Sequence, residues 1–243
     1  MKKVFIDPGH GGKDTGATAH GLLEKDIVLA VSLSVKKRLE AEYNGVQVLL
    51  SRSADVFPTL MERTEAANKA GADILVSVHC NAGGGAGGFE SYKYTHTSAA
   101  TASLQNVLHT EIMTALKPFN VIDRGQKAKN LHMVRESNMP AVLTENLFVD
   151  VAADAAKLKR EDVVGALIDG HVAGIAKYLG LQKKEAAGEV SDKVNVIVNG
   201  KPIQDGKLIN GVTYVPLRAT AEALGATVGW DNKTKTATIT HNP

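Results

Sequence analysis

The stretch VFIDPGHGG, residues 4–12, decides the fold of the first part of this chain. Its apolar run, residues 4–6, has the pattern of a short buried strand, and DPG, residues 7–9, is prone to turn. It therefore predicts a buried strand that ends just before His10. In open parallel α/β sheets the carboxyl ends of the strands lie along one edge, and that edge binds ligands.

Two further polar residues follow apolar runs in the same way. His79 comes after ILVSV, residues 74–78, and Glu145 comes after AVLT, residues 141–144. We expect both just beyond the ends of parallel strands, at the same edge as His10. Glu24 opens a stretch whose apolar residues recur at spacings of three and four, which predicts a helix that begins beside this edge. These apolar residues are Val28, Val31, Val35 and Leu39.

The four polar side chains are of the types that a hydrolytic zinc site requires. Such an ion takes three N or O ligands from protein, and a separate carboxylate moves protons. Taken alone, each residue has a simpler explanation: a histidine at a strand end is usually structural, and a glutamate in the first turn favours a helix. A carboxylate that ends a buried strand, such as Glu145, is costly unless it is paired or bound to a cation. The convergence of all four on one edge favours a metal site.

Longer motifs around these residues follow one another along the first part of the chain. They are VFIDPGHGGKDTGA from Val4, LLEKDIVL from Leu22, LLSRSADVFPTLMERTEAANKAGADILVSVHCNA from Leu49 and MPAVLTENLFVD from Met139. In content and order they resemble the zinc-dependent N-acetylmuramoyl-L-alanine amidases of the type 3 class, across residues 1–181. The resemblance implies an α/β fold with a twisted, mostly parallel sheet flanked by helices.

The same resemblance implies the chemistry of the site. His10, Glu24 and His79 would bind one zinc ion, and Glu145 would be the catalytic carboxylate. Zinc lowers the pKa of bound water from about 16 to about 7, and Glu145 would take the proton and pass it to the leaving nitrogen. The bond cleaved would join the lactyl group of N-acetylmuramic acid to L-alanine in bacterial peptidoglycan.

Two other kinds of protein remain possible on the sequence. A zinc peptidase on a similar sheet would use the same metal chemistry on the peptide stem, but the order of the motifs favours the amidase. A non-catalytic wall-binding protein would need no intact set of three ligands and a carboxylate, and this chain has one.

Several residues in these motifs have two explanations each. Asp14 would either orient His10 or make a local turn hydrogen bond, and we expect the turn. Arg52 and Arg63 would either fix a carboxylate of the peptide stem or form salt bridges within the fold, and we expect the salt bridges. The glycines of residues 9–12 indicate either close passage of the backbone beside metal or substrate, or a simple tight turn.

Composition excludes several classes of protein. A net charge of +2, without a basic stripe interleaved with aromatic residues, argues against nucleic-acid binding. No apolar run approaches the ~18 residues of a membrane span, and the first twelve residues are too short for a secretory signal. Cys80 is the only cysteine, so an intrachain disulfide is impossible, and strand alternation turns it away from His79 and from a zinc site. A lone thiol fits synthesis in a reducing compartment.

Because no signal peptide is visible, we expect synthesis in the cytoplasm, although the substrate lies outside the membrane. A phage endolysin, which leaves through a membrane lesion, and a lytic enzyme released from the mother cell during sporulation both fit. Between His79 and the helix expected near Ser98 there is only a Gly-rich stretch and FESYKY. Some members of the family carry a long helical insertion there that blocks the cleft until a partner removes it. Its absence predicts activity without an activator protein.

A change of pattern divides the chain. Residues 163–179 have the periodicity of a helix, and Gly180 is a natural stop. Residues 182–193, QKKEAAGEVSDK, are charged and lack apolar periodicity, which predicts a linker. We therefore expect a zinc amidase domain over residues 1–181 and a small β-rich α+β module over residues 194–243.

The module begins with short strands and turns. Asn199-Gly200 and Asp205-Gly206 predict two hairpins, because these residues tolerate positive φ. A helix over residues 217–224 and two further strands, near residues 227–230 and 236–240, complete the order of strands, helix, strands.

VPLRATAEALGATVGWDNKTKTATI from Val215 resembles a small module of secreted bacterial proteins that is named for the amino-terminal domain of copper amine oxidases. The name implies no copper here, since only His241 is a typical ligand. The module would either attach the enzyme to the cell envelope or serve as a folding or dimerisation cap. With five Lys/Arg and three Asp/Glu its charge is +2, a slight bias toward anionic wall polymers.

Overall fold

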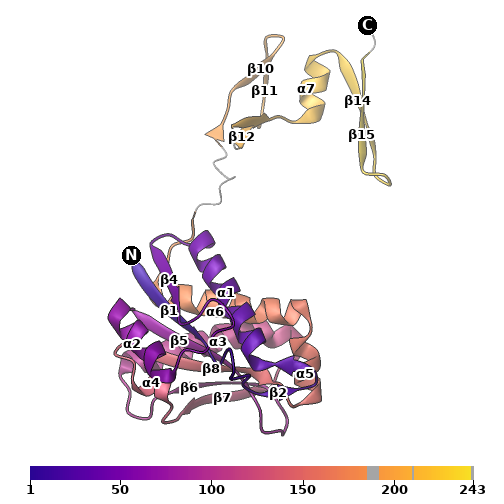
Figure 1. Cartoon of the computed structure of the whole chain (residues 1–243). Coiled ribbons are helices and arrows are strands. Elements are labelled where there is room, and N and C mark those ends of the chain that lie inside the picture. Colours follow the sequence, from indigo (N-terminus) through magenta and orange to yellow (C-terminus); the bar gives the residue numbers. More distant parts are fainter. Residues whose placement is uncertain (185–191, 210, 242–243) are drawn as a thin grey trace. The chain divides into compact units, whose positions relative to one another are not determined.

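A computed structural model describes residues 1–184, 192–209 and 211–241 (Figure 1). The chain divides into two compact units, Met1–Lys183 and Lys184–Pro243, which are described separately below. Of the linker predicted over residues 182–193, residues 185–191 lie outside the described residues. Its first residues belong with the first unit: the Asn44 amide donates to the Gln182 carbonyl at 2.9 Å, and Lys183 forms a β-bridge with Tyr43.

The first unit is built on a six-stranded sheet with the strand order β4-β1-β5-β8-β6-β7. Every neighbouring pair is parallel except β6 and β8, which run antiparallel. The predicted α/β fold with a mostly parallel sheet is therefore confirmed. The strands are β1 Lys2–Pro8, β4 Val46–Leu50, β5 Ile74–Asn81, β6 Phe89–Lys93, β7 Asp123–Ala128 and β8 Ala141–Phe148.

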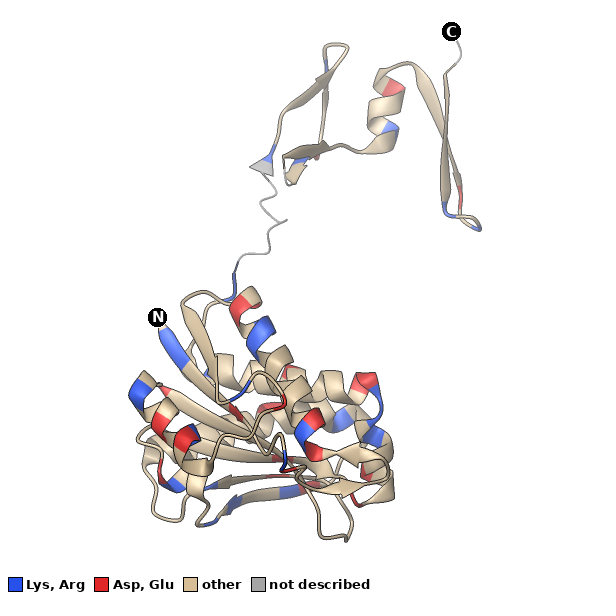
Figure 2. Cartoon of the chain, in the orientation of Figure 1, with Lys and Arg blue, Asp and Glu red and all other residues tan. Residues whose placement is uncertain are grey.

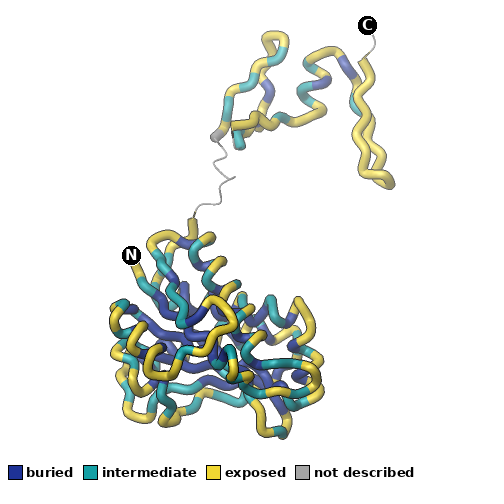
Figure 3. The backbone as a smooth tube through the Cα atoms, viewed as in Figure 1, coloured by how far each residue is buried: buried dark blue, intermediate teal, exposed yellow. Residues whose placement is uncertain are grey.

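Helices cover the two faces of this sheet unequally, and Figure 3 shows the strands as the buried centre of the unit. One face packs against three long helices in the main apolar cluster, which includes Val76 and Val142 of the sheet. The other face, with Phe5 and Leu143, packs against two short helices in a smaller cluster. The long helices are α1 Glu24–Glu42, α3 Ala99–Leu116 and α6 Glu161–Leu179; the short ones are α2 Leu60–Ala70 and α4 His132–Arg135. Minor elements are β2 Thr18–Ala19, β3 Leu22–Leu23, η1 Lys117–Phe119 and α5 Ala152–Leu158.

Two helices follow the sequence patterns closely. Helix α1 begins at Glu24, as predicted, and its four apolar positions are buried against the sheet. Helix α6 ends at Leu179, and Gly180 caps it in the left-handed conformation at φ 63°. Its start lies two residues before the predicted one, where Glu161 and Asp162 interact favourably with the dipole of the first turn.

Two strands run further than predicted. We expected β5 and β8 to end before His79 and Glu145, but both residues lie inside their strands. The cause is β6, which pairs with β8 at Glu90↔Glu145 and Phe89↔Asn146 and so continues the ladder past this point. His10 alone lies beyond the end of its strand, as predicted.

The second unit has the predicted order of strands, helix, strands. Asn199 and Gly200, at φ 49° and 78°, close an antiparallel hairpin between β10 and β11, which confirms the first turn. The hairpin predicted at Asp205-Gly206 is wrong, because β12 pairs with β9 and β13 instead of β11. Gly206 packs closely against Val196, and its carbonyl accepts from the Val194 amide, so the chain enters a separate ladder there. The elements are β9 Asp192–Lys193, β10 Val196–Val198, β11 Lys201–Ile203, β12 Lys207–Ile209, β13 Val212–Tyr214, α7 Leu217–Ala223, β14 Ala226–Asp231 and β15 Thr236–His241.

Within the described residues, none of the helices combines the length and the apolar character needed to cross a bilayer.

Candidate metal and catalytic site

The loop after β1 carries His10 in an uncommon backbone conformation. His10 has φ 56°, in the left-handed region that few non-glycine residues adopt. Two arginine side chains hold the loop: Arg63 Nη2 donates to the His10 carbonyl at 2.6 Å, and Arg52 Nη2 donates to the Gly9 carbonyl at 2.7 Å. The position of His10 therefore depends on side chains from distant segments.

The glycines of this loop meet both requirements that the sequence suggested, at different positions. A Cβ atom on Gly9 would lie 2.2 Å from Cε1 of His79, so the backbone passes directly against the imidazole ring. Gly11 has φ 123°, which L side chains rarely adopt. Gly9 is thus required by close approach, and Gly11 by the turn.

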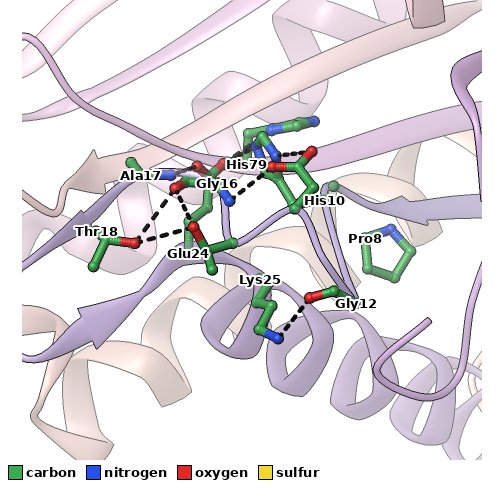
Figure 4. Close-up of polar contacts among 12 residues, drawn as sticks. Pro8, His10, Gly12, Gly16, Ala17, Thr18, Glu24, Lys25 and His79 are labelled. Carbon is green, nitrogen blue, oxygen red and sulfur yellow. Dashed lines mark hydrogen bonds and ion pairs between the residues drawn. The ribbon is translucent and has the colours of Figure 1, made fainter. Parts of the chain in front are cut away.

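One carboxylate oxygen is the meeting point of three chain segments (Figure 4). Glu24 Oε1 lies 3.1 Å from His10 Nε2, 2.9 Å from His79 Nδ1 and 2.9 Å from the Cys80 amide nitrogen. The other oxygen, Oε2, accepts from the Ala17 amide at 2.8 Å. One ligand atom from each of His10, Glu24 and His79 lies within 4.8 Å of the other two. The structure therefore brings together the three residues expected to bind metal.

Asp14 fulfils both roles that were considered for it. Its Oδ2 lies 2.9 Å from His10 Nδ1, and its Oδ1 accepts from the Gly16 amide at 3.0 Å. The expected turn bond is present, and the same carboxylate also orients the imidazole. With one proton held on Nδ1 by Asp14, His10 can offer Nε2 to a metal ion.

The electrostatics of this cluster favour positive charge at its centre. Burial alone would lower the pKa of His10, but the adjacent Glu24 and Asp14 carboxylates raise it to about 9. Burial likewise opposes protonation of His79, yet Glu24 and Glu145 raise its pKa. Burial would raise the pKa of Glu24, and the two histidines lower it. Two nitrogens and one oxygen that stabilise a cation between them match the donor set that zinc prefers.

Glu145 lies beside this cluster without a partner of its own. It is directly opposite His79 in the parallel register of β5 and β8. Its Oε2 is buried and makes no hydrogen bond within the described chain. The pKa of Glu145 is raised to about 7: burial is the largest cause, the negative charges of Glu24 and Glu90 add to it, and His79 opposes it. A buried, unpartnered carboxylate of this kind is suited to proton transfer near neutral pH.

Neighbouring strands place the polar residues in a row on the thinly covered face of the sheet. Glu90 pairs across β6 with Glu145, which in turn pairs with His79. Because directly paired residues project to the same side, the three side chains share one face. Sequence reasoning missed Glu90, although a lone glutamate inside the alternating strand FESYK was a usable signal.

A cavity of about 280 Å³ adjoins the cluster on the β1 side. His10 and His79 form one wall, and Phe57, Pro58 and Leu60, at the start of α2, form another. Phe57 is 39% exposed and Leu60 is 54% exposed. The cluster therefore faces an open, partly apolar space.

The two arginines of the sequence motifs are fully engaged within the fold. Arg63 forms a buried ion pair with Asp7 at 2.8 Å, as expected. Contrary to expectation, Arg52 forms no salt bridge among the described residues; buried beside the loop, it donates to the backbone carbonyls of Pro8, Gly9, Lys25 and Ala54.

Cys80 and two buried histidines have structural surroundings. Cys80 is buried on the face opposite His79 and lies outside the ligand cluster, as predicted. His109 bonds to Ser91 and Asp123, and His171 bonds to Thr144 and the Leu167 carbonyl.

Residues 4–177 match the protein family described as N-acetylmuramoyl-L-alanine amidase. The chain belongs to this family. It is 46% identical over 188 residues to the sporulation-specific N-acetylmuramoyl-L-alanine amidase of Bacillus subtilis, across 77% of this chain and 72% of that protein. It is also 46% identical over 202 residues to the endolysin of Bacillus phage SPP1, across 82% and 74% of the two chains.

Solved structures of the amidase family share the fold. The catalytic domain of CwlV from Bacillus (Paenibacillus) polymyxa superimposes with a TM-score of 0.70 at 35% identity, over 75% of this chain and 100% of that chain. An N-acetylmuramoyl-L-alanine amidase from Clostridium difficile 630 gives 0.70 at 34% identity, over 74% and 97%. Residues 193–243 match the copper amine oxidase N-terminal domain, which confirms the resemblance of the second unit.

Proposed function

We propose that this chain hydrolyses the amide bond between the lactyl group of N-acetylmuramic acid and L-alanine in bacterial peptidoglycan. His10, Glu24 and His79 would hold one zinc ion, and Glu145 would be the catalytic carboxylate. The observation that carries the proposal is the convergence of two imidazole nitrogens on one Glu24 oxygen beside the unpartnered Oε2 of Glu145. Membership of the amidase family supports the choice of substrate.

Each residue of the site has a part in this chemistry. A zinc ion bound here would supply an activated water and polarise the scissile carbonyl. Asp14 keeps the proton of His10 on Nδ1, so that Nε2 is free to act as a ligand. Glu145 accepts a proton at Oε2 and returns it to the departing alanine nitrogen, and its pKa near 7 suits both steps.

The rival functions have less support. A peptidase that cleaves within the stem would use the same ligands, but the family match favours the bond to L-alanine. A wall-binding protein without activity would not need a buried carboxylate with an unpartnered oxygen, which is costly to maintain.

The domain organisation forms part of the proposal. Residues 1–181 would be the catalytic domain, residues 182–193 a linker, and residues 194–243 an attachment module for the cell wall. Only a short segment separates β5 from β6, so no activator protein would be required. The enzyme would act on the wall outside the membrane, and the equal identity of 46% to a sporulation amidase and to an endolysin fits either release route.

Digestion of a defined muropeptide by the purified, zinc-loaded chain tests the proposal. Mass spectrometry should find a peptide with a free L-alanine amino terminus and an intact lactyl-bearing sugar. Glu145→Gln should retain bound zinc and lose most turnover, whereas Glu65→Gln, the same change at an exposed position of α2, should keep both. Cleavage within the stem, or full activity of Glu145→Gln, would contradict the assignment.

Removal of residues 184–243, which leaves the first unit whole, tests the attachment module. The truncated chain should hydrolyse the soluble muropeptide at the rate of the full chain and sediment less with purified cell walls. Unchanged sedimentation would refute the attachment role and favour a folding or dimerisation cap.

A further inference from the structure

Beyond Glu145 the row of polar side chains ends in a group of cations on β7 and directly after it. Glu90 is buried, and its two oxygens are fully occupied. Oε1 accepts from Asn81 Nδ2 and Tyr92 Oη at 2.7 Å each, and Oε2 accepts from Arg124 Nε at 2.7 Å and from Lys127 Nζ. Glu90 therefore serves as an anchor that fixes two cations beside the catalytic carboxylate.

Arg124 and Lys127 of β7, together with Lys129 just beyond its end, carry more positive charge than Glu90 neutralises. Figure 2 shows Lys and Arg along this edge of the sheet. Lys127 and Lys129 both lie over the Tyr92 ring, at 5.8 and 6.0 Å from its centroid. Three cations against one anchoring carboxylate leave a net charge of about +2 at neutral pH.

The two anchored cations keep unused hydrogen-bond donors near the surface. Arg124 binds Glu90 through Nε; its Nη1 makes one long bond of 3.3 Å to the Gly87 carbonyl, and its Nη2 makes none within the described chain. The guanidinium also lies over the Phe148 ring at 4.7 Å, which fixes its plane. The Arg124 and Lys127 side chains are 29% and 36% exposed. An anion from solvent can reach them without displacing Glu90.

The spacing between these cations and the cluster fits a short piece of peptide. Neighbouring strands lie about 4.8 Å apart, so β5 with His79 and β6 with Glu90 are separated by about 10 Å. An extended chain advances about 3.5 Å per residue, so a carboxylate one residue beyond L-alanine lies about 7 Å from the scissile carbonyl. Strand β7 lies one strand further out, but the Arg124 and Lys127 side chains reach back over β6, as their bonds to Glu90 show. They can therefore meet a substrate carboxylate about 7 Å from the scissile carbonyl.

We propose that Arg124 and Lys127 bind the free α-carboxylate of the second stem residue, the D-isoglutamate that follows L-alanine. This inference rests on the proposed amidase function and names a specificity determinant of the same site. The wall on the other side of the cluster is apolar, with Phe57 and Leu60 beside the cavity. The substrate therefore lies with its lactyl end toward α2 and its peptide toward β7.

Two muropeptides that differ only at this carboxylate provide the test. One carries D-isoglutamate and the other its neutral amide, D-isoglutamine; kcat/KM is measured for both with the zinc-loaded full chain. The wild type should prefer the carboxylate by about tenfold to hundredfold, the range that a charge-assisted hydrogen bond supplies. Arg124→Gln and Lys127→Met should each reduce this preference, mainly through KM, because they slow the carboxylate substrate more than the amide substrate.

Arg160→Gln serves as the control, because it removes an exposed cation that pairs with Asp162 elsewhere on the first unit. It should preserve the preference. Equal rates of the wild type on the two substrates would refute the carboxylate site while leaving the amidase function intact. A variant that slows both substrates equally would also refute it, because it would assign the cations to support of Glu90 alone. Cleavage of neither substrate by the wild type would refute the amidase function itself, and this inference with it.

Discussion

Replacement of Arg63 by methionine tests how the His10 loop is held. Arg63 and Asp7 form an ion pair at 2.8 Å, with side chains only 2% and 1% exposed. Burial alone would raise the pKa of Asp7, but Arg63 lowers it, together with a hydrogen bond from Ser51. Arg63→Met leaves Asp7 with two serine hydroxyl donors, from Ser51 at 2.6 Å and Ser77 at 2.7 Å.

The expected loss of stability follows from the response of Asp7. Without Arg63, the least costly folded state holds a proton on Asp7, whose ordinary pKa is 3.8. Keeping that proton at pH 7 costs about 4 kcal/mol, which agrees with the ~3–5 kcal/mol found when one partner of a buried pair is removed. Arg63 also donates to the carbonyls of Pro8, His10 and Pro58. The loss of each of these bonds adds about 1 kcal/mol or more, independently of pH.

Urea unfolding followed by helical circular dichroism, with a chelator present, measures this loss. In the wild type the contribution of Asp7 is present above its unfolded pKa of 3.8 and disappears as the pH falls through the lower folded value. In the folded variant Asp7 holds a proton, so the free-energy cost of keeping it protonated shrinks as the pH falls. The difference between the two proteins should narrow by about 3 kcal/mol from pH 7 to pH 5.

The double variant Asp7→Asn/Arg63→Met should show no such pH dependence. The difference in free energy of unfolding between the wild type and Arg63→Met could instead be the same at both pH values, or be below about 1 kcal/mol at pH 7. Either result would show that the serine donors alone satisfy Asp7. The reasoning about the buried pair would then be refuted.

Three further changes test the metal cluster. Gly9→Ala would place a Cβ 2.2 Å from the His79 ring, so the zinc affinity should fall by about 100-fold while the circular dichroism spectrum stays native. Competition with a chromophoric chelator measures the affinity, and an unchanged value would contradict the close approach. Asp14→Ala removes the orienting bond to His10, and the same titration should show a loss of about 10-fold, whereas no loss would reduce Asp14 to a turn residue. For Glu145 the folded pKa of about 7 lies above the ordinary 4.5, so this group destabilises the metal-free fold progressively as the pH rises between these values. Metal-free Glu145→Gln should therefore gain thermal stability relative to the wild type as the pH rises across this range. If the difference in melting temperature between the two proteins is the same at pH 4.5 and pH 7.5, the pKa shift is disproved.

Local patterns predicted a good part of the site, because much of it is encoded near each residue. The start of α1 at Glu24 and the end of β1 before His10 follow from apolar periodicity and turn residues. The extension of β5 and β8 past His79 and Glu145 was not predictable in this way. This extension depends on the antiparallel pairing of β6 with β8, which no local sequence pattern predicts.

Long-range partners set the remaining differences. Arg52 sits in a recognisable motif, yet its acceptors are backbone carbonyls from three separate segments, which no local pattern specifies. Glu90 shows the same limitation, because its role depends on Glu145 across one strand and on Arg124 across the other. The turn at Asp205-Gly206 has suitable residues for a hairpin, but pairing of β12 with β9 decides against it.

The meeting of three segments at one oxygen of Glu24 has a mechanical consequence. Glu24 and His79 are 55 residues apart in the sequence, and His10 belongs to a third segment. An ion held by these three ligands would close loops of the chain as a covalent cross-link does, and each closure removes conformational freedom from the unfolded state. The same three side chains would then govern how long the protein survives proteolysis, since a chain closed in this way opens less often.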